Sequence, residues 1–94
     1  MPVGRAERRA ARRTRVAVLF ADDTDRALDL IEMLEIAWHD LYGEITPPPE
    51  VIEDVLTLSE GRLPTLIKWS RLALVDLRDV RLAADEMRKE NGAG

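Results

Sequence analysis

The chain has 94 residues, with 18 acidic and 14 basic side chains, a formal net charge of −4 and no cysteine. This length is typical of one domain with a thin core, and such domains often gain stability by associating with a second molecule. The lack of cysteine excludes disulfide bonds, zinc–thiolate sites and a thiol nucleophile. No apolar run is long enough to span a membrane, and the short run at 16–21 is unlike a signal peptide, so we expect a cytoplasmic protein.

Charge is unevenly distributed along the sequence. Residues 5–15 hold six arginines and one acid, whereas residues 22–60 hold twelve acids and one base. We treat residues 1–94 as a single helical domain in which residues 1–15 form a basic arm. The sequence leaves open whether this arm is ordered and whether it binds a partner or the acidic part of the chain.

The first predicted element runs from Arg5 to about Ala21. It begins with alanine and arginine, which are good helix formers, and ends in an apolar run at 16–20 that periodicity alone cannot assign. Because no helix breaker falls near Thr14 and no partner strand is evident, we predict one continuous helix. A strand over residues 14–20 is the alternative.

Two further helices are predicted in the middle of the chain. Asp23 or Thr24 can cap the first of them, and Gly43 suits the position just beyond its end. Pro49 can open a shorter helix that ends at Gly61. The first of these helices has an apolar stripe at three- and four-residue steps, formed by Leu28, Ile31, Leu34, Trp38 and Leu41.

The last third of the chain predicts one helix from Pro64 to about Lys89, which would be about 40 Å long. A heptad-like seam runs along it, formed by Leu63, Leu66, Ser70, Ala73, Leu77, Val80, Ala84 and Met87. The predicted fold is therefore all-α, a small bundle of three or four helices with a long C-terminal helix.

This last helix also carries apolar residues away from the seam, more than one neighbouring helix can cover. We predict a non-catalytic interaction module that associates with a second copy or another protein through this surplus. The predicted interface residues are Ile67, Trp69, Leu72, Val75 and Leu82. Tryptophan is over-represented at interfaces, and Trp69 lies beside Lys68 and Arg71, which makes it the favoured anchor.

The arginine-rich segment gives a second hypothesis. Four of its arginines share one helical stripe and could follow the phosphates of a nucleic acid: Arg8, Arg9, Arg12 and Arg13. No aromatic residue is interleaved with them for base stacking. The competing interpretation is that they pair with the acidic helix of the same or a neighbouring molecule.

Two pairs of acids give a third hypothesis. Glu32 and Glu35 form one pair, and Asp76 with Asp79 forms another, so that facing pairs could hold magnesium. In these four residues the chain resembles the all-helical nucleotide pyrophosphohydrolases, although the surrounding pattern of that family is absent. The resemblance implies a magnesium-dependent nucleotide phosphohydrolase.

The sequence contains few residues of the types that other catalytic mechanisms require. His39 is the only histidine, and although Glu35 lies one helical turn before it, a stable transition-metal site needs three or four ligands. There are two serines and no glycine-rich phosphate loop. We therefore assign no catalytic residue, metal or cofactor.

Overall fold

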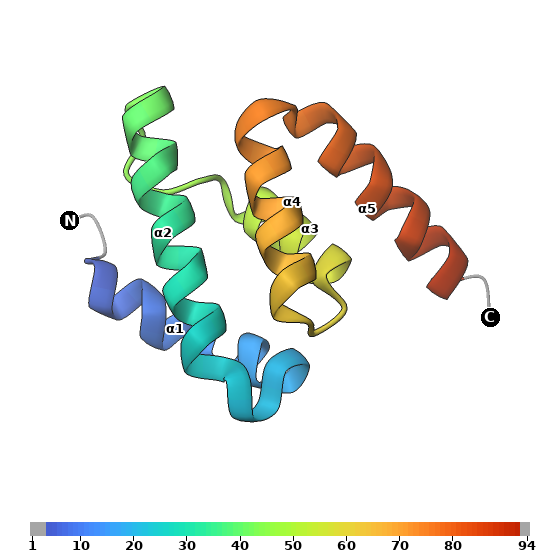
Figure 1. Ribbon diagram of the computed structural model, residues 1–94, viewed down its shortest axis with the longest axis horizontal. Coiled ribbons are helices and arrows are strands. Elements are labelled where there is room, and N and C mark those ends of the chain that lie inside the picture. The colour runs from blue at the N-terminus through green and yellow to red at the C-terminus, as the bar shows by residue number, and fades with distance from the viewer. Residues whose placement is uncertain (1–3, 93–94) are drawn as a thin grey trace.

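The computed structural model describes residues 4–92, which form five α-helices and one short 3-10 helix, with no strand among them (Figure 1). The elements in chain order are α1 (Arg5–Phe20), η1 (Ala21–Asp23), α2 (Thr24–Tyr42), α3 (Pro49–Ser59), α4 (Leu63–Val75) and α5 (Leu77–Gly92). The prediction of an all-α fold is confirmed. There is one helix more than predicted because the last third of the chain divides into two.

The arginine-rich segment is helical. Helix α1 continues without a break through residues 14–20, so the prediction of a helix rather than a strand is confirmed. Val16 and Phe20 at its C-terminal end are buried, which explains why the apolar run lies there. Residues 5–15 of the predicted arm therefore belong to α1, and its first three residues lie outside the described part of the chain.

Helix α2 ends as its sequence predicts but begins differently. Gly43 has φ +74° and its N–H donates to the carbonyl of His39 at 2.8 Å, a left-handed C-terminal cap. The prediction that Asp23 or Thr24 caps the N-terminus with its side chain is wrong. The 3-10 turn leads directly into α2, so the N–H of Thr24 bonds to the carbonyl of Ala21, and the hydroxyl donates to the same oxygen.

The helix predicted across the last third of the chain is interrupted at Asp76, and α4 and α5 meet there at a bend (Figure 1). Asp76 has φ −145° and ψ 83°, and its N–H donates to the carbonyl of Leu72 at 2.7 Å. Its carboxylate accepts from the N–H of Asp79 at 3.3 Å, so the same residue ends α4 and caps α5. The predicted rod of about 40 Å is thus replaced by two shorter helices.

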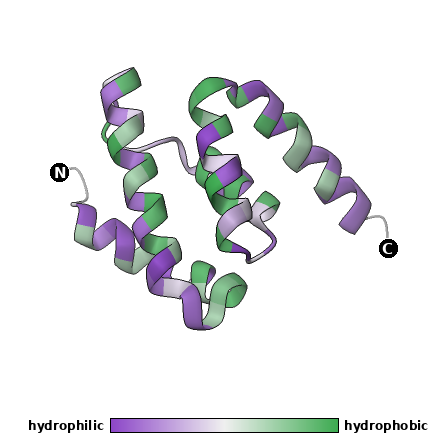
Figure 2. Ribbon diagram, viewed as in Figure 1, coloured by the Kyte–Doolittle hydropathy of each residue, from purple (hydrophilic) through white to green (hydrophobic). Residues whose placement is uncertain are grey.

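All five helices contribute side chains to one hydrophobic core. Helix α3 contacts both α4 and α5, while α1 packs on α2 and α2 packs on α4. Figure 2 shows hydrophobic and hydrophilic residues alternating along the helices, as expected of elements with one buried face. The fully buried core side chains include Val16, Leu28, Ile31, Val55, Leu56, Leu66 and Val80.

An ion pair links α5 to α3. The carboxylate of Asp54 is almost completely buried, and its Oδ1 lies 2.8 Å from Nη2 of Arg88. The same guanidinium group lies within hydrogen-bond distance of the hydroxyl of Thr57. These contacts, together with the buried seam residues Val80 and Ala84, hold α5 against α3.

Candidate interaction surface

The outer face of α4 carries apolar side chains that the rest of the described chain leaves uncovered. Leu66, Ser70 and Ala73 on its inner face are buried. Because of the helical repeat, residues such as Ile67 and Val75 lie on the outer side. Val75 is 85% exposed and Ile67 is 41% exposed. They belong to a shallow groove of about 560 Å³ that is lined by Pro64, Ile67, Lys68, Arg71, Leu72 and Val75, which we call the α4 face.

The structure places three of the five predicted interface residues on the α4 face. Ile67 and Val75 are exposed there, and Leu72 is half-buried in the groove. Trp69 is half-buried against the core, with Nζ of Lys68 5.0 Å from its ring centroid, and it does not line the groove. Leu82 is exposed on α5, outside the groove.

The charged side chains that line the α4 face are cations, Lys68 and Arg71. Neither Lys68 nor Arg71 forms an ion pair with any described residue, and no carboxylate lines the groove. Asp76 is exposed just beyond the end of α4, and its carboxylate accepts only the backbone N–H of Asp79. This face therefore offers apolar area, two cations and one nearby acid to a binding partner.

The arginines of α1 are in the opposite situation, because α2 supplies carboxylates for them. Oε2 of Glu35, a residue 2% exposed, lies 2.6 Å from Nε of Arg8 and 3.2 Å from Nη1 of Arg12. Burial alone would raise the pKa of Glu35, but hydrogen bonds from Thr46 and Arg8 and the charge of Arg12 outweigh it and hold the pKa below its ordinary value. Glu35 thus anchors α1 to α2 as a carboxylate.

Further along the same contact, a second group of ion pairs lies at the surface. Arg9 reaches Asp29 at 2.7 Å and Glu32 at 3.2 Å, and Arg13 reaches Asp25 at 2.9 Å. All four predicted nucleic-acid-binding arginines therefore have intramolecular carboxylate partners. The acidic stripe on α2 was the sequence signal for this arrangement, which matches the competing interpretation of the arginine-rich segment.

The four acids that suggested a magnesium site make other contacts within the fold. Glu32 and Glu35 face the arginines of α1, and Asp76 with Asp79 forms the start of α5. Within residues 4–92 no three acidic or histidine side chains are grouped so that they could hold a metal ion. The single histidine, His39, is exposed, with Nδ1 3.3 Å from the carbonyl oxygen of Glu44.

Comparison with known proteins gives no relative: no family model, no curated protein and no solved structure matches this chain. None of the described helices is long and apolar enough to cross a membrane. The described residues form a small all-helical domain in which α4 carries an uncovered apolar face beside a cationic groove.

Proposed function

We propose that this chain is a non-catalytic interaction module that associates in the cytoplasm with a second copy of itself through the α4 face. The observation that carries the proposal is the exposure of Val75 and Ile67 on one groove, next to two cations that pair with no carboxylate among the described residues. Isolated exposed apolar residues are ordinary, but a grouped apolar patch rimmed by polar side chains is typical of an interaction surface.

A second copy suits this face because the face is complementary to itself. In a two-fold contact the same patch meets its own copy, so residues equally far before and after the axis come together. If two α4 helices run antiparallel about an axis at Arg71, Ile67 of each copy lies opposite Val75 of the other. Lys68 then comes within reach of the other copy's Asp76, which supplies the carboxylate that the groove lacks.

Arg71 near the axis is compatible with this arrangement. Its methylene stem can cover the apolar residues of the groove while its guanidinium group stays in water on either side of the contact. The contact is a single helix face, so we expect a dimer in the micromolar range rather than an obligate one.

The first test is the molecular mass in solution, measured by sedimentation at tens of micromolar. We expect the natural sequence to be a dimer and Val75→Lys to be a monomer with unchanged helical content, because Val75 makes few contacts within its own chain. Val18→Lys is the matched control, since Val18 is an exposed valine on α1, 76% accessible, and this variant should remain a dimer. A monomeric natural sequence at these concentrations would overturn the proposal.

The second test addresses the antiparallel arrangement and uses the absence of cysteine from the chain. Arg71→Cys alone should form a disulfide-linked dimer under mild oxidation, because two copies of this position meet near the axis. Ile67→Cys alone should not cross-link, whereas a mixture of Ile67→Cys and Val75→Cys should. A dimer that cross-links through none of these positions would contradict the arrangement.

A further inference from the structure

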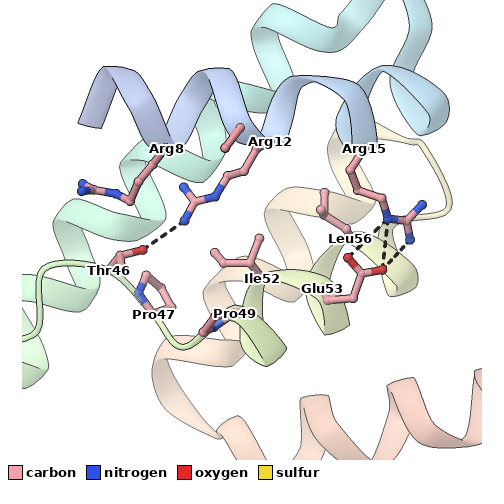
Figure 3. Close-up of a pocket in the computed structure, with 10 residues that line it drawn as sticks. Arg8, Arg12, Arg15, Thr46, Pro47, Pro49, Ile52, Glu53 and Leu56 are labelled. Atoms are coloured by element: carbon pink, nitrogen blue, oxygen red, sulfur yellow. Dashed lines mark hydrogen bonds and ion pairs between the residues drawn. The ribbon is translucent and has the colours of Figure 1, made fainter. Parts of the chain in front are cut away.

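A second concave surface lies between α1 and α3, away from the α4 face. It is a cleft of about 530 Å³, which is within the range of sites that bind small molecules. Figure 3 shows α1 above the cleft and α3 below it, with side chains from both helices and from the segment before α3 facing the space. The cleft is lined by Arg8, Ala11, Arg12, Arg15, Thr46, Pro47, Pro49, Ile52, Glu53 and Leu56.

The floor of the cleft is apolar. Ile52 and Leu56 project from α3 toward α1, and Pro47 and Pro49 lie at one end (Figure 3). Ile52 and Leu56 are buried members of the core, so this floor is fixed by packing rather than by mobile surface side chains. An alkyl chain placed here would be removed from water along much of its length.

The rim of the cleft holds more positive than negative charge. Three arginines line it: Arg8 and Arg12 pair with Glu35, which lies outside the lining, and Arg15 pairs with Glu53 at 2.6 Å. The lining thus holds three cationic side chains and one carboxylate, Glu53, although the whole chain has a net charge of −4.

The guanidinium group of Arg12 lies toward the space of the cleft (Figure 3). Nη2 of Arg12 donates to the hydroxyl of Thr46 at 3.1 Å, which holds this guanidinium group beside the apolar floor (Figure 3). Arg8 directs its guanidinium group away from the space, whereas Arg15 closes the other end with Glu53 (Figure 3). An arginine has five N–H donors, so Arg12 keeps some for a bound anion.

We propose that this cleft binds a monoanionic amphiphile, an unbranched alkyl carboxylate whose chain lies on Ile52 and Leu56. The carboxylate is placed against Arg12 and Arg15, where it accepts hydrogen bonds from their guanidinium groups. This site is separate from the α4 face and does not depend on self-association.

Calorimetric titration of the full chain with hexanoate, heptanoate and octanoate tests the apolar half of the proposal. We expect one molecule bound per chain, with affinity rising about fourfold for each added methylene group that is buried. Octan-1-ol, which has the same chain without the charge, should bind more weakly than octanoate. The absence of saturable octanoate binding below the concentration of micelle formation would overturn the proposal.

Two variants of one ion pair test the charged half. Arg15→Gln and Glu53→Gln break the same exposed pair, so a purely structural role would give both the same effect. We expect Arg15→Gln to weaken octanoate binding about threefold to tenfold and Glu53→Gln to strengthen it, because they change the charge of the rim in opposite directions. Shifts of both affinities in the same direction would overturn the proposal.

Arg13→Gln is the control for net charge. It removes one positive charge from the same helix, but Arg13 pairs with Asp25 and does not line the cleft. Its octanoate affinity should therefore equal that of the natural sequence. A loss as large as that of Arg15→Gln would show that only the overall charge matters and would also overturn the proposal.

Discussion

The basic residues of α1 and those of α4 are used in opposite ways. On α1, Arg8 and Arg12 share the buried carboxylate of Glu35, whereas on α4 Lys68 and Arg71 form no ion pair with any residue of the described range 4–92. The segment with the higher density of arginine is thus the one whose arginines are paired with carboxylates of the same chain. A basic cluster is available to a partner only where the neighbouring helix does not supply acids, and in this chain α2 supplies them to α1 alone.

The first prediction from this comparison is that the free energy of unfolding depends strongly on Glu35, which joins α1 to α2. Glu35→Gln leaves Arg8 and Arg12 without their shared anion in a partly buried position, so we expect the free energy of unfolding to fall by about 2–4 kcal/mol. Urea denaturation followed by circular dichroism measures this loss. Glu32→Gln, which removes a more exposed partner of Arg9, should cost under about 1 kcal/mol. Equal losses in the two variants would contradict the special role of Glu35.

The second prediction concerns acid and the same carboxylate. Its pKa in the folded state lies below the ordinary value of 4.5, so its contribution is fully present above that value and is lost as the pH falls through the folded-state pKa. We therefore expect the stability difference between the natural sequence and Glu35→Gln to shrink steadily below about pH 4.5. Unfolding midpoints measured at a series of acidic pH values check this. A difference that grows with acid would show that the pKa is raised instead.

The smallest expected effect concerns nucleic acid. Because carboxylates of α2, Glu35 among them, pair with Arg8, Arg9, Arg12 and Arg13, we expect a labelled DNA duplex to show no binding tighter than about 1 µM at physiological salt. Fluorescence anisotropy measures this, with replacement of all four by alanine as the comparison. Submicromolar binding that falls steeply with salt and is lost in that variant would revive the nucleic-acid hypothesis.

Local rules predicted much of the helical framework. The continuity of α1, the C-terminal cap at Gly43 and the start of α3 at Pro49 each follow from one residue or a short run. The bend at Asp76 was missed because a single aspartate is only a weak helix breaker and the apolar seam continues on both sides of it. The apolar seam correctly predicted that Leu66 is buried, because the repeat within α4 is the same whether or not the helix continues past Asp76.

The surfaces were harder to predict, because they depend on which helix lies beside which. Periodicity shows that Val75 and Trp69 are off the seam, but only the packing of α4 reveals that Val75 is open while Trp69 is half-buried. The cleft beside Arg12 and Arg15 had no signal in the sequence. Its two walls come from segments about forty positions apart, such as Arg15 and Glu53, whose meeting is decided by the tertiary fold.

The bend at Asp76 also makes the C-terminal helix depend on contacts with residues that are distant in the sequence. A straight helix over the last third of the chain would form from neighbouring residues alone, on the time scale of local helix formation. Because the chain turns back, α5 instead docks on α3, where Arg88 meets Thr57, 31 positions earlier. Closing that distance costs chain entropy, so the stability of α5 depends on its packing against α3 as well as on its own helical hydrogen bonds.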